Sequence, residues 1–340
     1  MFERHYGLSG PPFSLTPPEQ GFFDSESHGK ALAYLQYGLQ QGEGFIVVTG
    51  AVGTGKSTVV NRLFAELDPE KLDAARIVTS QIQASAALRM ILDAFGRRCR
   101  SSDKGIMVRD LEKFLGARRE QGRRALLVID EAQNLPPRTL EEIRMLSNLT
   151  AGGQSLLQTF LVGQPQFQRV LSDPSMEQFR QRVIGWCHLE PMSATEAGAY
   201  VRHRLVQVGW NGNPGIAEAA LAVVHRESGG IPRMVNQMCN RLLLFGALEQ
   251  LAWLDAEHAE AAIADLRAEQ NGAGPAPEAA PVDAAPAVRD DALPRELASL
   301  RRTVESHHQM LSHLVQLVGA RLAPAPAPAV IPLPRRPHHA

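Results

Sequence analysis

Eight residues, GAVGTGKS at positions 50–57, have the types and spacing of a phosphate-binding loop, G-x-x-x-x-G-K-[ST]. Glycines let successive backbone N–H groups converge on phosphate oxygens, and a helix that starts after the loop adds its positive N-terminal end. An apolar run, GFIVVTG, precedes the loop and the helix-like KSTVVNRLFAELD follows it, which disfavours a chance glycine-rich turn. The residues expected to bind a nucleotide are Gly50, Ala51, Val52, Gly53, Thr54, Gly55, Lys56, Ser57 and Thr58.

Two adjacent acids at the end of another apolar run, LLVIDEAQ, have the chemistry that a bound nucleoside triphosphate requires. Lys56 would reach the β- and γ-phosphates, while the Ser57 hydroxyl and Asp130 would hold Mg²⁺. Glu131 would polarise a water molecule for attack on the γ-phosphate. One carboxylate for the metal and one for water suits ATP hydrolysis, whereas a small-molecule kinase would also have to position an acceptor hydroxyl. A solvated charge at a strand end is the alternative interpretation of Glu131.

Three further polar residues follow the apolar segments. Gln164, in LVGQPQF, ends a strand-like run, and ligands of parallel sheets bind beyond the carboxyl ends of strands. We therefore expect Gln164 to contact the attacking water or the γ-phosphate, although it could simply begin a proline turn. Arg180 and Arg182, in EQFRQRVIG, precede the last strand-like run. Either one could extend to a neighbouring subunit as an arginine finger in trans, or both could be ordinary surface arginines.

Arg233 is placed where a helix begins, in GGIPRMVNQ. A helix N-terminus favours anions, so a cation there needs a reason. Polyphosphate is an anion that a helix N-terminus and an arginine can bind together. Pro232 suits the first helical position because its missing N–H costs nothing there. We expect Arg233 to contact the γ-phosphate and to couple hydrolysis to domain motion; an ordinary surface arginine is the alternative.

The order of strand-like and helix-like segments predicts an α/β domain followed by a helical one. Five strand-like segments alternate with helices, which predicts a parallel sheet. The third of them, RRALLVIDEAQNL, is fully apolar before its acids, as expected for a parallel strand buried on both faces. After Pro191 only helical patterns continue, to residue 268, which predicts a small all-α domain. The five strand-like segments are GFIVVTG, AARIVTSQI, RRALLVIDEAQNL, SLLQTFLVGQ and RVIGWCHLEPM.

Beyond the helical domain the composition changes. Residues 269–292 are rich in Pro and Ala and predict a linker. In residues 293–322, apolar side chains alternate at spacings of four and three, which predicts either a coiled-coil seam or a single amphipathic helix that docks on the body. Residues 323–340 are expected to be a disordered tail. The expected divisions are 1–40 for an N-terminal segment, 41–191 for the core, 192–268 for the helical lid, then linker, helix and tail.

Overall composition limits the class of protein. Lys and Arg number 35 against 36 Asp and Glu, so no broad nucleic-acid footprint is indicated, although a local patch is possible. The three cysteines form no paired framework and are expected to be free thiols. No signal peptide and no apolar run long enough for a membrane span is evident. We expect a cytoplasmic protein that could associate peripherally with a membrane through partners.

Together, five motifs resemble those of AAA+ ATPases: GAVGTGKST, LLVIDEAQNLPPRTLEEIRMLSNL, FLVGQPQF, FRQR and GGIPRMVNQMCNRLL. Their order is similar to that of the ExeA/GspA-like ATPases of secretion systems. Within that group, HYGLSGPPFSLTP and ALAYLQYGLQQGEGFIVVTG resemble the ATPase associated with exosortase (PEP-CTERM) systems, which is encoded with exopolysaccharide genes. The resemblance covers residues 1–268.

The resemblance implies a three-layer P-loop ATPase core with a helical lid, working with ATP and Mg²⁺ as a homo-oligomer. Lys56 and Ser57 match the Walker A motif, and Asp130 and Glu131 match Walker B. Gln164 falls at the sensor-1 position and Arg233 at the sensor-2 position, while Arg180 or Arg182 would be the trans finger. The N-terminal segment, around residues 6–13, would close over the adenine. The implied function is ATP hydrolysis that serves an envelope export or secretion system through protein partners.

Two other functions remain open at this point. A DNA-associated AAA+ helper, as in transposition or replication initiation, would share the Gly-x-Pro-Arg lid, but no helix-turn-helix follows the lid here. A nucleotide-gated scaffold would bind ATP and rarely hydrolyse it.

Overall fold

A five-stranded parallel sheet forms the centre of the part of the protein that precedes the four C-terminal described helices, as the alternation of elements predicts. The computed structural model describes residues 2–14, 22–78 and 84–270. The strands lie in the order β2-β3-β6-β1-β7, and every neighbouring pair is parallel. All five predicted strands are confirmed. They are β1 (Phe45–Gly50), β2 (Leu72–Val78), β3 (Arg124–Asp130), β6 (Gln158–Gly163) and β7 (Val183–Leu189).

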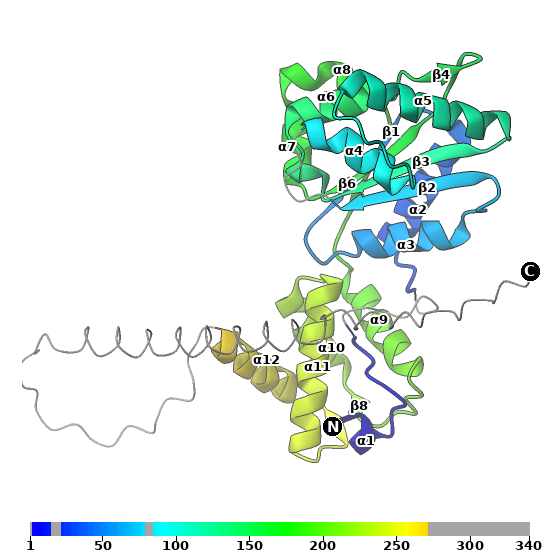
Figure 1. Cartoon of the computed structure of the whole chain (residues 1–340). Helices are drawn as coiled ribbons and strands as arrows, with labels where there is room; N and C mark the ends of the chain where they lie inside the picture. The colour runs from blue at the N-terminus through cyan, green and yellow to red at the C-terminus, as the bar shows by residue number, and fades with distance from the viewer. Residues whose placement is uncertain (1, 15–21, 79–83, 271–340) are drawn as a thin grey trace, which may run out of the picture. The chain divides into compact units, whose positions relative to one another are not determined.

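Helices cover both faces of this sheet (Figure 1). One face packs against α2 (Glu26–Gln41) and α3 (Lys56–Glu66). The other packs against the remaining core helices. These are α4 (Ala84–Ala94), α5 (Lys104–Glu120), α6 (Pro137–Leu146), α7 (Gln166–Ser172) and α8 (Glu177–Arg180). Since α2 packs on the sheet, it belongs with the core and not with the predicted N-terminal segment.

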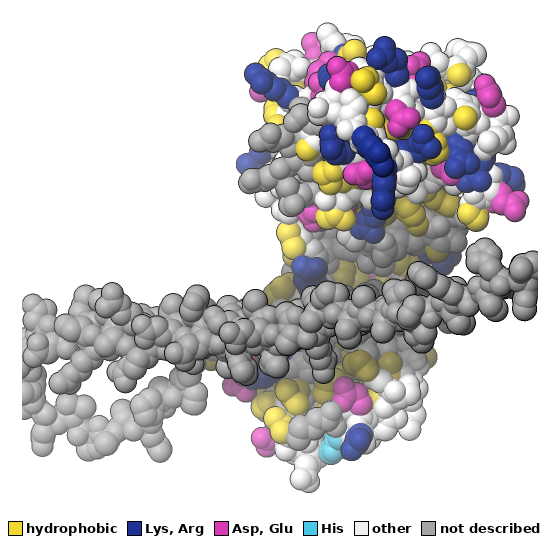
Figure 2. Space-filling view, in the orientation of Figure 1, with side chains coloured by type: hydrophobic (Ala, Val, Ile, Leu, Met, Phe, Trp, Pro, Cys, Tyr) yellow, Lys and Arg dark blue, Asp and Glu magenta, His cyan; other side chains and the backbone are white. Residues whose placement is uncertain are grey.

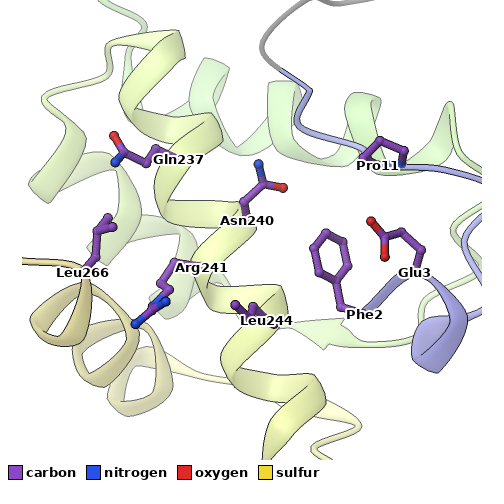
Figure 3. Close-up of a pocket in the computed structure, with 8 residues that line it drawn as sticks. All are labelled: Phe2, Glu3, Pro11, Gln237, Asn240, Arg241, Leu244 and Leu266. Carbon is purple, nitrogen blue, oxygen red and sulfur yellow. The ribbon is translucent and has the colours of Figure 1, made fainter. Parts of the chain in front are cut away.

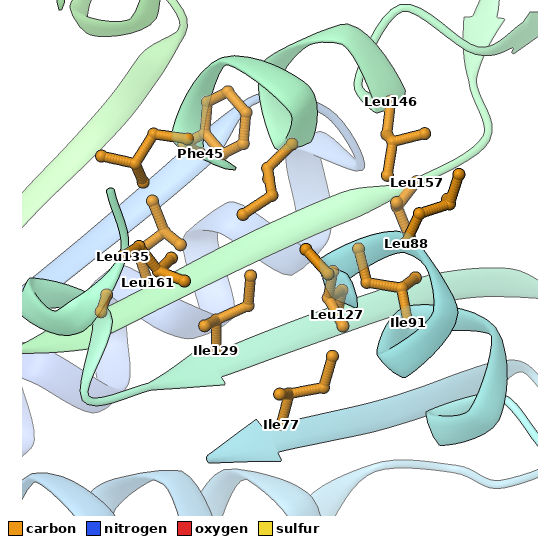
Figure 4. Close-up of a cluster of buried hydrophobic side chains, with 14 of the residues drawn as sticks. Phe45, Ile77, Leu88, Ile91, Leu127, Ile129, Leu135, Leu146, Leu157 and Leu161 are labelled. Carbon is orange, nitrogen blue, oxygen red and sulfur yellow. The ribbon is translucent and has the colours of Figure 1, made fainter. Parts of the chain in front are cut away.

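Burial on both faces explains the unbroken apolar runs of the central strands β1, β3 and β6. In β1, Phe45 and Val47 belong to the core under the α4–α8 helices, whereas Ile46 and Val48 belong to the core under α2 and α3. Figure 4 shows the first of these cores, where side chains from β3 and β6 meet those of α4. Alternate residues thus serve opposite layers, as expected for a central parallel strand.

Four helices follow β7 and enclose a separate hydrophobic core, as predicted for the lid. They are α9 (Ala194–Val206), α10 (Glu218–Ser228), α11 (Pro232–Leu248) and α12 (Ala256–Gln270). The prediction of helices alone was wrong in one respect, because β8 (Gly215–Ile216) and β9 (Trp253–Leu254) form a short parallel pair. Gly215 permits this pairing, since a Cβ there would overlap the Trp253 ring. Two-residue strands carry no periodicity that a sequence pattern could reveal.

The N-terminal residues pack on the lid core. Helix α1 (Phe2–Tyr6) and the following turn bury Tyr6, Leu8 and Phe13 among lid side chains. The carbonyl of Pro12 accepts a hydrogen bond of 2.7 Å from Arg204 Nε in α9. Residues 6–13 therefore do not line the nucleotide cleft described below, and the expectation that they close over the adenine is corrected.

Shorter elements and the chain ends complete the description. A hairpin of β4 (Thr150–Ala151) and β5 (Gln154–Ser155) precedes β6, and the one-turn helices η2 (Ala132–Asn134) and η3 (Pro174–Met176) join longer elements. None of the described helices is long and apolar enough to cross a bilayer. The predicted linker from residue 271, the heptad helix and the tail lie outside the described residues. Cys99, Cys187 and Cys239 are free thiols.

Candidate functional site

The phosphate loop joins β1 to α3, and its lysine lies beneath it. Lys56 Nζ donates hydrogen bonds of 2.9 Å to the carbonyls of Gly50 and Ala51. Burial lowers the pKa of Lys56, and the nearby Arg233 charge lowers it further, while Glu131 and Asp130 act in the opposite direction. The loop therefore holds a cation partly removed from water, where an anion would be bound strongly.

Gly53 and Gly55 take backbone conformations that other residues rarely adopt, with φ of +86° and +95°. A Cβ on Gly55 would overlap the imidazole of His28, which packs against the loop from α2. The His28 ring lies 3.0 Å from the Thr54 carbonyl through Nε2 and 2.5 Å from Ser25 Oγ through Nδ1. His28 was not among the predicted site residues, because nothing in its local sequence shows which loop it contacts.

Ser57 and Asp130 meet at the carboxyl edge of the sheet. Ser57 Oγ donates a hydrogen bond of 3.2 Å to Asp130 Oδ2, and Asp130 is only 3% exposed. A hydroxyl and a carboxylate are the hard oxygen ligands that Mg²⁺ prefers. These two residues fit the predicted metal site and would hold the ion there.

Glu131 is held by two glutamines. It has a left-handed backbone, with φ of +55°, and its Oε2 accepts hydrogen bonds from Gln133 Nε2 and, at 3.3 Å, from Gln164 Nε2. Gln133 Oε1 in turn accepts a hydrogen bond of 2.9 Å from the Gln164 backbone N–H. The structure thus places predicted Gln164 beside predicted Glu131. The bridging Gln133 was missed, although its place two residues after Glu131 was a usable signal.

Arg233 reaches the phosphate loop from the first turn of α11. Its backbone N–H donates a hydrogen bond of 3.2 Å to the Gly53 carbonyl. A Cβ on Gly53 would lie 2.7 Å from Arg233 Cβ, so the loop and the lid helix approach each other closely. Arg233, which the GGIPRMVNQ motif placed at a helix start, therefore lies next to the phosphate loop that the GAVGTGKS motif predicted.

These residues line one cleft of about 400 Å³. Its lining includes residues of the loop, Glu131, Gln164 and Arg233, and also Phe22, Phe23, Tyr200 and Asn236 of α11. Burial raises the pKa of Tyr200, whose hydroxyl donates a hydrogen bond of 2.8 Å to Asn236 Oδ1. The cleft thus combines aromatic and polar lining. Four of its lining residues are cations and one is an acid: Lys56, Arg62, Arg204, Arg233 and Glu131.

A second cavity, of about 370 Å³, lies between α1, α11 and α12 (Figure 3). Its lining is mixed, with Phe2 and Leu244 beside Arg241, whose guanidinium forms an ion pair with Glu269. It includes none of the predicted site residues, whereas the first cleft includes many of them.

Arg180 and Arg182 are not among the residues that line the cleft. Arg180 Nη1 donates hydrogen bonds to the carbonyls of Leu171 and Asp173, at 2.6 and 2.7 Å. Arg182 Nη1 donates to Ser147 Oγ at 3.0 Å. The proposed arginine finger, Arg180 or Arg182, would therefore act in the cleft of another copy of the chain.

The fold and the cleft define a P-loop domain of the AAA+ type. Residues 39–171 match the family model described as AAA domain. The sequence is 41% identical, over 249 residues and 72% of this chain, to general secretion pathway protein A of Aeromonas hydrophila. The chain spans 44% of the length of that relative.

Solved structures show the same fold at low identity. Drosophila ORC bound to DNA has a TM-score of 0.58 at 16% identity, covering 80% of this chain and 67% of that one. Cdc6p from Pyrobaculum aerophilum has a TM-score of 0.58 at 17% identity, covering 75% and 70%. Aeropyrum pernix ORC2, solved with ADPNP and ADP, has a TM-score of 0.57 at 15% identity, covering 75% and 71%. These likenesses establish the AAA+ fold.

Proposed function

We propose that this protein binds ATP with Mg²⁺ and hydrolyses it. The observation that carries the proposal is that Lys56, Ser57, Glu131, Gln164 and Arg233 line one cleft. Asp130 contacts Ser57 behind this lining, and Gln133 contacts Glu131. The aromatic side chains of the lining suit a base, and its cations suit a polyphosphate. ADPNP in the Aeropyrum pernix ORC2 structure supports an adenine nucleotide.

Each residue has a defined part in the proposed reaction. Lys56 and Arg233 neutralise charge that develops on the phosphates. Mg²⁺, when bound, neutralises phosphate charge from the side of Ser57 and Asp130. Gln133 and Gln164 fix the Glu131 carboxylate, which orients a water molecule and accepts its proton. Gln164 contacts the same water, and Arg180 or Arg182 completes the site of a neighbouring copy.

We further propose that turnover serves an envelope export or secretion system, through protein partners. The similarity to general secretion pathway protein A supports this class of process. The opening HYGLSGPPFSLTP supports the finer assignment to exosortase and exopolysaccharide systems. Exosortase or exopolysaccharide genes beside the gene for this protein are the expected finding, and a neighbouring transposase gene would contradict it.

The decisive experiment measures ATP hydrolysis and nucleotide binding side by side. Glu131→Gln should keep nucleotide affinity and lose turnover by about 10²-fold or more, because only proton acceptance is removed. Lys56→Ala should lose binding itself. If the wild-type chain shows no turnover even at concentrations where it oligomerises, the nucleotide-gated scaffold replaces the enzyme.

One observation favours a second candidate, the DNA-associated helper. Residues 89–124 contain eleven Lys and Arg against five Asp and Glu, in a chain whose formal net charge is −1. Arg98, Arg100, Arg109 and Lys113 are exposed there, and in the described part of the chain none of the four forms an ion pair. Figure 2 shows Lys and Arg gathered on the face covered by α4 and α5. A salt-dependent mobility shift of duplex DNA would favour this candidate.

A further inference from the structure

Arg76 projects from β2 towards the metal site that Ser57 and Asp130 would form. Strands β2 and β3 pair in register, with Val78 opposite Asp130, so Arg76 lies two residues before that carboxylate on the neighbouring strand. Its Nη2 is 2.5 Å from Asp130 Oδ2, and its Nη1 donates a hydrogen bond of 2.7 Å to Asn61 Oδ1 in α3. The planar guanidinium spans both partners, which a lysine ammonium could not do in the same way.

The partly buried position of Arg76 has an unfavourable free-energy term. Arg76 Nε is buried and has no hydrogen-bond partner among the described residues. An orphaned buried N–H is unfavourable, and an apolar residue at this position of β2 would avoid it. A contribution to the stability of the fold therefore does not by itself explain why an arginine occupies position 76.

Asp130 Oδ2 is shared. The same oxygen that meets Arg76 also accepts the hydrogen bond from Ser57 Oγ. In the proposed function, Ser57 Oγ and Asp130 Oδ2 both face Mg²⁺. The Arg76 guanidinium and the metal ion would therefore act on the same Asp130 carboxylate. Two cations near one anion repel each other, and in a partly buried site the repulsion is weakly screened.

We propose that Arg76 is a positioning residue that fixes the Asp130 carboxylate and sets the Mg²⁺ requirement of the site. The guanidinium holds Oδ2 in place, and Mg²⁺ must bind against this fixed positive charge. The inference rests on the proposed Mg²⁺–ATP function and concerns how much metal that function needs.

The test measures binding of a fluorescent, non-hydrolysable ATP analogue at increasing Mg²⁺, together with the Mg²⁺ dependence of the melting temperature. Arg76→Gln removes the charge and should lower the half-saturating Mg²⁺ concentration by about tenfold. Arg76→Lys retains the charge and should stay within about twofold of the wild type. If Arg76→Gln does not fold, Arg76→Met, which keeps an apolar stem, takes its place.

Arg123→Gln is the matched control. Arg123, the residue just before β3, forms an ion pair with Asp73 of β2 at the other end of these strands, with Nη2 2.5 Å from Asp73 Oδ1. This variant should leave the half-saturating Mg²⁺ concentration unchanged. An unchanged or higher Mg²⁺ requirement in Arg76→Gln would overturn the inference. Absence of any Mg²⁺ dependence in the wild type would instead overturn the metal part of the proposed function.

Discussion

At the scale of single residues, His28 shows how a buried side chain can support the phosphate loop from a neighbouring helix. The Thr54 carbonyl can only accept a hydrogen bond, so His28 Nε2 donates to it, and in the neutral ring Nδ1 accepts from the Ser25 hydroxyl. Burial lowers the pKa of His28, although the Thr54 carbonyl and the charges of Asp24 and Glu196 oppose the shift. Burial therefore favours the neutral ring.

Stability should depend on pH through this residue. The pKa of His28 is lower in the folded chain than its ordinary value of 6.5, so the unfolded chain binds the proton more readily. The contribution of the His28 contacts to the free energy of unfolding is complete above pH 6.5 and is lost as the pH falls below that value. His28→Gln keeps a donor for the Thr54 carbonyl but does not titrate. Urea unfolding between about pH 7.5 and 5.5 should show a shallower loss of stability in His28→Gln; equal slopes would contradict the assignment.

Residues that belong to one contiguous motif could be predicted, and those that meet only through the fold could not. All the residues that form the phosphate loop are contiguous in GAVGTGKS, since the loop and the start of the following helix lie within eight residues. Arg76 and His28 instead lie on β2 and α2, far from the acids and the loop that they contact. Their local sequence carries no sign of these partners, because strand order and helix packing bring them together.

At the scale of elements, the junction between the phosphate loop and α11 depends on a glycine. Gly53→Ala should weaken nucleotide binding by at least about tenfold, because its Cβ would press against Arg233 in addition to straining the backbone. The strain from positive φ alone costs about 1–2 kcal/mol. Affinity for an ATP analogue and urea unfolding report the two effects separately.

Gly122 provides the control for strain. Its φ is +77°, close to that of Gly53, but a Cβ there would meet nothing within 4 Å. Gly122→Ala should therefore lose a similar amount of stability and keep its nucleotide affinity. Equal nucleotide affinities in the two variants would show that the contact between loop and lid helix does not matter for binding.

Helices and strands could be predicted where burial of one face gives their apolar residues a regular spacing in the sequence. The five strands and four lid helices are long enough for their apolar spacing to identify them, and the alternation of strands with helices indicated parallel pairing. The order β2-β3-β6-β1-β7 and the β8–β9 pair depend on contacts between distant segments. The family resemblance implied that residues 6–13 close over the adenine, but Tyr6, Leu8 and Phe13 pack in the lid core.

At the scale of the whole molecule, the described residues contain complete hydrophobic cores. Residues 1–275 form one compact unit, and the buried residues of its three cores all lie before residue 270. Removing residues 276–340 should therefore leave the melting temperature and the nucleotide affinity unchanged. Calorimetry and analogue binding check this, and a large fall in melting temperature would show that the tail belongs to the catalytic body.

The same truncation tests the predicted heptad helix. Leu297, Leu300 and Leu311 are among its seam positions, and a coiled coil would contribute to self-association or partner binding. The truncated protein should form smaller oligomers by light scattering while single-site binding persists. Unchanged oligomers would favour the other interpretation, in which the helix is a single amphipathic segment.

The hydrogen bond from the Arg233 N–H to the Gly53 carbonyl joins lid and loop through the main chain alone. Mutation changes side chains, so except for proline no substitution at position 233 deletes this bond. Natural variation can therefore exchange the side chain at position 233 while the main-chain link between the two parts persists. Over evolutionary time, descendants of this sequence can lose that arginine and still inherit a lid attached to its phosphate loop.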